Sequence, residues 1–256
     1  MATFLNFNRP VITTMLKGDN TGTLINEIKA AKEEGTDAFC FEIEIMKKEC
    51  RTESDFKDIF SAMGDKPAYI TNYRRGNVCE YEQSDEELTE EMLLALDCGA
   101  TLFDIRGDLY DPCPLEITYD ETAIKRQMKL VDTVHKMGKE VLMSTHTLKY
   151  MSEAEVLKIA KAQEARGVDI AKVVTAGETE GEEYSNLATT LKLREELKIP
   201  YLFLSIGANC KKHRLLGPSL GCSLFLSVAK GTDGGAQPPM EKAKEILTTL
   251  GYKNLP

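Results

Sequence analysis

Eight short apolar runs recur along the chain at roughly 30 residues per unit, and they alternate with longer segments of helical spacing. The runs are rich in β-branched and aromatic residues and are bounded by Gly, Pro or Asp, which favours strands over helices. Strands that alternate with helices pair in parallel through right-handed crossovers. The predicted strands span residues 10–16, 38–46, 67–74, 101–107, 140–147, 169–176, 200–207 and 223–229.

The segments between the strands carry helix start and stop signals. The segment that begins at Ser84 reads S-D-E-E, close to a capping box, and it ends before Gly99. A Gly in that place supplies the left-handed conformation that closes a helix. The predicted helices span residues 23–34, 54–63, 84–98, 119–137, 152–166, 182–197 and 240–250.

Eight such units in 256 residues match the size of one (β/α)₈ barrel, the TIM barrel of the α/β class, so we expect a single domain over 1–256. A doubly wound open sheet is the alternative. The glycine-rich dinucleotide fingerprint that would favour that sheet is absent after the first strand, where LKGDNTG stands instead.

Composition narrows the classes of partner. Acidic residues outnumber basic ones by 41 to 32, which argues against nucleic acid, and no apolar run approaches the roughly 20 residues that span a membrane. Seven cysteines form no CxxC pair and the N-terminus lacks a signal-peptide layout, so we expect reduced thiols and a cytoplasmic location. With three histidines in the chain, we expect no metal, and we expect no other cofactor.

In a barrel of this kind, function lies at the C-terminal ends of the strands and in the loops that follow them. The polar residues at those places are the candidate site residues, together with the loop after Gly207. They are Glu42, Glu44, Thr71, Arg106, His146, Lys172 and Ser205.

Lys172 lies inside the otherwise apolar run DIAKVVTA. Burial disfavours the ammonium form, and a neutral amine can attack a carbonyl and form a Schiff base. A lysine buried against an acidic partner would give the same pattern, so spacing leaves both interpretations open.

His146 lies near the end of the preceding strand. Adjacent strands are roughly 5 Å apart, so the two side chains could meet in one pocket, where histidine would act as a general acid/base. A structural imidazole is the alternative. We interpret His135, in a helix, and His213, in a basic loop, as non-catalytic.

The stretch 205–221 contains the one dense basic patch of this acidic chain, at residues 211–214. It is either a solvated loop or an anion clamp. Arg214 suits the second role because its planar fork binds carboxylates at two points.

Several short motifs of the C-terminal half share their order and spacing with one family. They are S-x-H at 144–146, I-x-K at 170–172, S-I-G at 205–207 followed by Arg214, L-x-G-x-x-x-G at 215–221, and a late loop ending in Gln at 231–237. On these motifs the chain resembles type I 3-dehydroquinate dehydratase, the Schiff-base enzyme of the shikimate pathway of aromatic amino acid biosynthesis.

The resemblance implies a lyase that eliminates water from 3-dehydroquinate or a related hydroxy-keto acid, working as a homodimer. It gives Lys172 the imine with the substrate ketone and makes His146 the general acid/base. Arg214 would hold the substrate carboxylate, and Gln237 would help to close the pocket, with 231–237 as a candidate lid.

The chain departs from the family in its first half. The family's second strand carries E-x-R-x-D, where this chain has Cys40, Glu42 and Glu44, or Glu42, Glu44 and Met46 after a two-residue shift. In either alignment the arginine is missing and an acid replaces it.

Further departures follow on the next strands. The family's T-x-R is replaced by Thr-Asn-Tyr at 71–73, with Arg74 one place later, and its D-x-E ends in Arg106 instead. The residue after the histidine is Thr147 rather than Asp, and Asp233 replaces a serine. An arginine lost on one strand and gained on another suggests that Glu42 or Glu44 forms a relocated ion pair with Arg106.

Two other functions remain open. A class I aldolase acting on another keto acid could use the same lysine, and a ligand-binding homologue could keep the fold without turnover. One barrel supports many chemistries, so the fold does not decide among them.

Overall fold

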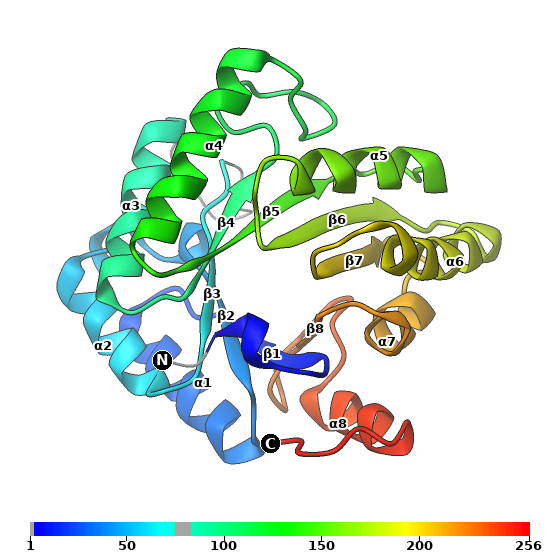
Figure 1. Cartoon of the computed structure of the whole chain (residues 1–256). Helices are drawn as coiled ribbons and strands as arrows, with labels where there is room; N and C mark the ends of the chain where they lie inside the picture. The colour runs from blue at the N-terminus through cyan, green and yellow to red at the C-terminus, as the bar shows by residue number, and fades with distance from the viewer. Residues whose placement is uncertain (1–2, 75–82) are drawn as a thin grey trace.

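The computed structural model describes residues 3–74 and 83–256, which form a parallel barrel ringed by helices (Figure 1). The strands are β1 Val11–Met15, β2 Ala38–Glu42, β3 Ala68–Thr71, β4 Leu102–Arg106, β5 Glu140–His146, β6 Ile170–Ala176, β7 Tyr201–Ile206 and β8 Leu224–Ser227. The helices are α1 Thr21–Glu34, α2 Glu53–Met63, α3 Asp85–Cys98, α4 Glu121–Lys136, α5 Glu153–Glu164, α6 Glu180–Glu196, α7 Lys211–Leu220 and α8 Met240–Thr249. The predicted (β/α)₈ fold is confirmed.

The barrel closes at a seam between β7 and β8. Hydrogen-bonded ladders run in the order β7-β6-β5-β4-β3-β2-β1-β8, and no ladder joins the two end strands within the described residues. Instead, Ser223 donates its backbone N–H to the Tyr201 carbonyl at 2.8 Å. The Cys222 thiol donates to the Phe203 carbonyl and accepts from the Phe203 N–H, both at 3.4 Å. A thiol therefore takes the place of a backbone group at this edge.

Strand alternation separates two layers of side chains, as β4 illustrates. Phe103 and Ile105 face the helices and belong to a core shared with them, whereas Leu102 packs in the other apolar cluster. Asp104 lies on the same face as Leu102 and is 3% exposed. This alternation aims Asp104 and Arg106 into the barrel.

Helix α7 was not predicted, because residues 211–220 were expected to form part of a basic loop. Its buried residues are His213, Arg214, Gly217 and Pro218, so it presents no apolar repeat. Within the basic patch, His213 and Arg214 are buried, whereas Lys211 and Lys212 are exposed.

Strand β2 is shorter than its apolar pattern predicts. It ends at Glu42, and the next residues form a 3₁₀ helix, Ile43–Ile45. Glu44 therefore does not continue the strand alternation, although it remains buried, at 4% exposed.

Two further features concern the described residues alone. Six cysteines there are free thiols, and Cys79 lies outside the described ranges. Across 3–74 and 83–256, every helix is too short or too polar to traverse a lipid bilayer.

Candidate active site

Lys172 is buried at the centre of the barrel, where it is 5% exposed. Its Nζ donates hydrogen bonds to the Tyr69 hydroxyl at 2.9 Å and to the Tyr73 hydroxyl at 3.0 Å. The Asp104 Oδ2 atom lies 3.5 Å from Nζ. We call these four residues the lysine cluster.

Asp104 ties the cluster together because its Oδ2 accepts a hydrogen bond from each tyrosine. The bond from the Tyr73 hydroxyl is 2.6 Å long, and Tyr69 makes the second. Burial, and then the charge of Asp104, raise the pKa of both phenols well above their ordinary value. Lys172 thus has both features weighed from sequence: it points into the barrel, and an acidic partner lies beside it.

His146 comes from the neighbouring strand, at the mouth of the barrel. In the β5–β6 register, Ser144 pairs with Lys172 and His146 with Val174, so His146 lies one inward position above the lysine. Its ring meets that of Tyr73 edge to face, with centroids 5.1 Å apart. Tyr73 thus contacts both residues proposed for catalysis.

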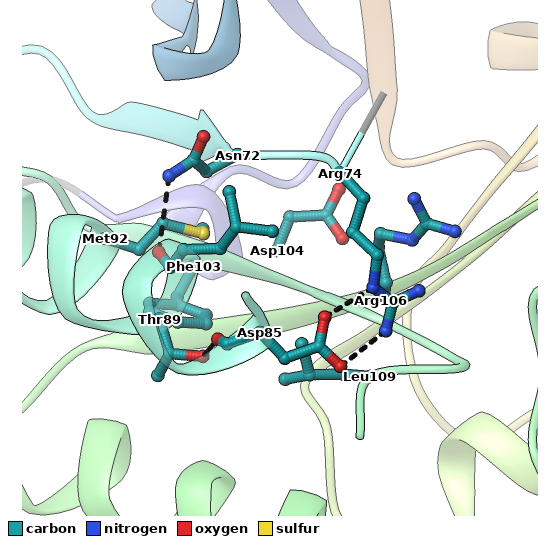
Figure 2. A pocket seen from close by; sticks show the side chains of 10 residues that line it. Asn72, Arg74, Asp85, Thr89, Met92, Phe103, Asp104, Arg106 and Leu109 are labelled. Carbon is teal, nitrogen blue, oxygen red and sulfur yellow. Dashed lines mark hydrogen bonds and ion pairs between the residues drawn. The ribbon is translucent and has the colours of Figure 1, made fainter. Parts of the chain in front are cut away.

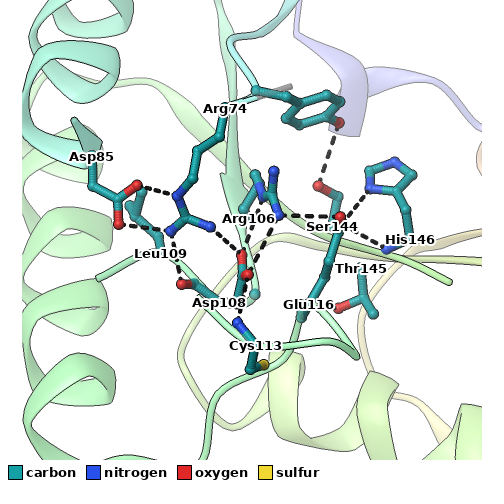
Figure 3. A network of polar contacts seen from close by, with 12 residues as sticks. Arg74, Asp85, Arg106, Asp108, Leu109, Cys113, Glu116, Ser144, Thr145 and His146 are labelled. Atoms are coloured by element: carbon teal, nitrogen blue, oxygen red, sulfur yellow. Dashed lines mark hydrogen bonds and ion pairs between the residues drawn. The ribbon is translucent and has the colours of Figure 1, made fainter. Parts of the chain in front are cut away.

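Glu116 holds His146 in place (Figure 3). One of its oxygens lies 3.1 Å from both the backbone nitrogen and the ring Nδ1 of His146. Burial works to raise the pKa of Glu116, but the hydrogen bond from His146 and the charge of Arg106 outweigh it and lower that pKa. An ionised carboxylate only accepts, so Nδ1 carries the hydrogen and Nε2 keeps a lone pair.

The imidazole is set up as a base. Burial, and then the charge of Lys172, lower the pKa of His146 despite the opposing contribution of Glu116. The ring is therefore neutral near pH 7, which a general base requires.

The sequence gives no local signal for Glu116, which lies in the long loop between β4 and α4. Its backbone has φ of +49°, an uncommon conformation for a residue with a side chain. The loop also approaches the barrel closely, since a Cβ on Gly107 would lie 2.5 Å from the Glu116 carbonyl oxygen. A glycine at 107 is thus required for Glu116 to reach His146.

Arg106 points into the same network rather than toward β2. Its guanidinium lies 3.1 Å from Glu116 and 3.1 Å from Asp108. Arg74 pairs with Asp108 at 3.0 Å and with Asp85 on α3 (Figure 3). Arg74 is thus engaged by acids beside α3, where it borders a small cavity of about 10 Å³ (Figure 2).

The relocated ion pair expected between Arg106 and Glu42 or Glu44 does not form. Glu42 pairs with Lys17 at 2.6 Å, while both carboxylate oxygens of Glu44 accept from the Thr71 hydroxyl at 3.0 Å. Burial, and then the charge of Glu42, raise the pKa of Glu44 to about 8. The expectation was wrong because β2 ends at Glu42 and because closer acids in the loop after β4 neutralise Arg106.

Arg214 is buried in the first turn of α7, where its Nε donates to the Ser205 carbonyl at 2.5 Å. Its Nη1 has no hydrogen-bond partner among the described residues. Burial lowers the pKa of Arg214 to about 10. An unfilled donor on a buried cation suits an anionic ligand.

Two other residues, Ser205 and Gln237, were also predicted to contact the substrate. The Ser205 hydroxyl accepts from Asn186 on α6 at 2.8 Å, so this side chain faces the helices, contrary to its expected substrate contact. Gln237 closes a turn, donating its backbone N–H to Gly234 at 2.9 Å, and it follows β8 on the barrel's mouth side. His213, interpreted from the sequence as a non-catalytic residue of a basic loop, lies instead in α7, where its Nε2 atom is 2.8 Å from the Thr190 hydroxyl.

A cavity of about 750 Å³ opens at the mouth beside His146, between the loops after β4 and β5. Arg106 and Glu116 also line it. In the described parts of the chain, no group of three or more His, Cys, Asp or Glu side chains is arranged to hold a metal ion. The arrangement offers a buried amine, a neutral imidazole and an anion-binding guanidinium, which together suit imine chemistry on a carbonyl acid.

Comparison with known protein families gives a match over nearly the whole chain. Residues 12–254 match the family model of type I 3-dehydroquinase. The chain belongs to this family.

Curated relatives agree with this assignment. A 3-dehydroquinate dehydratase of Lactiplantibacillus plantarum is 28% identical over 238 residues, covering 90% of each chain. One from Shouchella clausii is 22% identical over 247 residues, covering 94% of this chain and 92% of the relative.

Solved structures agree on the fold. The type I 3-dehydroquinate dehydratase of Clostridium difficile, with covalently modified comenic acid, has a TM-score of 0.81 at 19% identity. That match covers 95% of this chain and 93% of the other. The enzyme from Geobacillus kaustophilus has a TM-score of 0.79 at 18% identity, covering 96% and 93%.

Proposed function

We propose that this protein is a hydro-lyase that eliminates water from 3-dehydroquinate, or from a closely related hydroxy-keto acid, through an imine on Lys172. The observation that carries the proposal is the burial of the Lys172 amine in the barrel, one inward position below His146. Family membership and the names of the curated relatives support the same reaction.

Lys172 supplies the nucleophile. Its ammonium first releases one proton to solvent, and the neutral amine adds to the substrate ketone to form a carbinolamine. The carbinolamine hydroxyl takes a proton back and leaves as water, which forms a protonated imine that draws electrons from the neighbouring carbon. That carbon then loses a proton more readily, and a hydroxyl β to the imine leaves as water. Hydrolysis of the imine frees the conjugated product and restores the amine.

His146 moves the protons. Its pKa is lowered and its Nδ1 is held by Glu116, so Nε2 is the atom that takes the proton from carbon and returns it to the leaving hydroxyl. Glu116 acts on the substrate only through His146 and is a positioning residue.

Arg214 would bind the substrate carboxylate through its unpartnered Nη1. We assign substrate contacts to Thr71, Glu44, Glu42 and Arg106 around the mouth, and to the loop that ends in Gln237. Because Tyr73 and Arg106 stand where the family pattern has Arg and Glu, the hydroxyls of the substrate meet a different set of partners here.

Reductive trapping tests the proposal. The protein is incubated with 3-dehydroquinate and sodium borohydride, digested, and searched for the modified residue by mass spectrometry. We expect a reduced adduct on Lys172, no adduct in Lys172→Met, and steady-state formation of a conjugated enone. An adduct that forms with other keto acids but not with 3-dehydroquinate would reassign the substrate to one of those acids. Cleavage of a carbon–carbon bond would indicate an aldolase. If no carbonyl compound can be trapped, the Schiff-base mechanism is refuted, and a ligand-binding homologue without turnover becomes the better interpretation.

We also propose that the protein is a cytoplasmic homodimer. The resemblance to the family supports the dimer, and the six described free thiols suit a reducing compartment. Analytical ultracentrifugation measures the dimer directly, and a monomer at micromolar concentration would refute it.

A further inference from the structure

The lysine cluster contains two tyrosines that the reaction outlined above does not use. Their hydroxyls lie 2.9 and 3.0 Å from the Lys172 Nζ, and both donate to the same oxygen of Asp104. A hydroxyl accepts and donates at once, so each phenol already lies between a nitrogen that gives protons and an oxygen that takes them.

The two tyrosines differ in what lies around them. Tyr69 is 1% exposed and its ring packs against Phe4, with centroids 6.5 Å apart, so it is enclosed. Tyr73 follows the end of β3, is half-buried, and meets the rings of His146 and the guanidinium of Arg106. Since His146 and Arg106 line the large cavity, Tyr73 is the tyrosine on the side from which a carbonyl would reach Lys172.

We propose that Tyr73 is a further catalytic residue, whose hydroxyl relays a proton from the Lys172 nitrogen to the oxygen of the tetrahedral adduct during imine formation. This inference rests on the proposed Schiff-base function and adds a residue to it. Tyr73 touches the reacting nitrogen directly.

The step balances in atoms and charge. When the Lys172 amine adds to a carbonyl, the new adduct carries a positive nitrogen and a negative oxygen. One N–H proton passes to the Tyr73 oxygen while the Tyr73 phenol proton passes to the adduct oxygen. The products are a neutral carbinolamine and an unchanged tyrosine.

The surroundings suit a relay rather than a base. The pKa of Tyr73 is raised, by burial first and by Asp104 next, so the phenol holds its proton until the adduct oxygen takes it. The phenol proton must turn from Asp104 toward the adduct, which needs only rotation about the C–O bond. Tyr69 keeps its own hydrogen bond to Asp104 meanwhile, so the buried carboxylate is never left without a donor.

The test compares Tyr73→Phe with the wild type and with Tyr201→Phe as a matched control. Tyr201 is a buried tyrosine outside the site, whose hydroxyl donates to the Thr190 carbonyl at 2.7 Å. Two rates are measured for Lys172: borohydride trapping of the 3-dehydroquinate imine, and acetylation by acetic anhydride, which needs the amine but forms no carbinolamine. We expect trapping in Tyr73→Phe to fall about 10²-fold while acetylation is unchanged. Tyr201→Phe should alter neither rate.

An unchanged trapping rate in Tyr73→Phe would overturn the relay, and so would a parallel fall in trapping and acetylation, which would mean that Tyr73 only positions the lysine. Should Tyr73→Phe fail to fold, the wild type is trapped in D₂O and in H₂O. Slower trapping in D₂O is expected, and equal rates would overturn the proposal.

Trapping with two carbonyl compounds, 3-dehydroquinate and pyruvate, distinguishes failure of the Tyr73 proposal from failure of the proposed function. If the wild type traps pyruvate but not 3-dehydroquinate, the substrate assignment fails while the Tyr73 comparison is made with pyruvate. If the wild type traps neither, both proposals are refuted.

Discussion

Replacing Asp104 by Asn removes the negative charge from the lysine cluster while keeping the size of the side chain. The Asp104 side chain is fully buried, that of Lys172 is 7% exposed, and the two charged groups lie 3.5 Å apart. Asn retains one acceptor oxygen for the tyrosine hydroxyls, but it leaves the ammonium without a counter-charge.

The expected loss of stability can be worked from that distance. Two unit charges 3.5 Å apart attract by about 5 kcal/mol at an effective dielectric of about 20. Breaking one side of a buried pair typically costs about 3–5 kcal/mol. We therefore expect the free energy of unfolding to fall by about 3–5 kcal/mol, and the thermal midpoint to fall by about 10 °C.

Urea denaturation of Asp104→Asn, Lys172→Met and the double variant provides the assay. The double variant removes both charges. Its loss in free energy of unfolding should therefore be smaller than the summed losses of the two single variants, by more than about 0.5 kcal/mol. Glu53→Gln is the control, because Glu53 pairs with Lys57 at 2.5 Å in full exposure, and no measurable change is expected. Additive losses in the double variant would refute the reasoning.

Other substitutions test single groups of the site. His146→Ala should lower turnover by about 10²–10⁴-fold while borohydride still labels the lysine, and loss of labelling would contradict a role confined to proton transfer. Glu116→Gln should lower the pKa of His146 further and move the acid limb of the pH–rate profile to lower pH. NMR titration of the imidazole checks this, with the exposed Glu121→Gln as a control that should leave the ring unaffected. Because the pKa of Glu44 is raised from 4.5 to about 8, the folded state holds a proton there that the unfolded state releases, so wild-type stability should fall between about pH 5 and 8. Glu44→Gln should remove that fall in urea denaturation at pH 5 and pH 9, and an unchanged slope would count against it. Arg214→Leu should raise KM for a carboxylate substrate about 10–100-fold, and an unchanged KM would rule out the anion contact.

The architecture could be predicted because its signals are local. Each strand is a short apolar run, and alternation within β5 and β6 is enough to place His146 and Lys172 on inward positions. Helix α7 was not predicted because polar and small residues, among them Arg214 and Pro218, fill its buried face. Pattern reasoning detects burial only where the buried residues are apolar.

The partners of the site residues could not be predicted, because they depend on contacts between loops. Glu116 reaches His146 through a left-handed backbone conformation and a close approach over Gly107. Arg106 is neutralised by acids two and ten positions later in the chain, at Asp108 and Glu116. The loss of an arginine on one strand and its gain on another suggested that Arg106 pairs with Glu42 or Glu44. Residue types alone do not reveal which acid lies nearest to Arg106.

At the seam between β7 and β8, separate hydrogen bonds rather than a continuous ladder join the two edges of the sheet. In the described part of the chain, the edges are joined by two hydrogen bonds from Ser223 to the Tyr201 carbonyl, one from its N–H and one from its hydroxyl, and by the two contacts of the Cys222 thiol. Arg214 follows β7 and Gln237 follows β8, so the two residues proposed to grip and cover the substrate lie on opposite sides of this edge. A thiol and side-chain packing hold this edge in place of a ladder, so we expect it to open more easily than the edges between the other strands. Amide exchange should accordingly be faster at Phe203 than at Phe103 in the β4–β5 ladder.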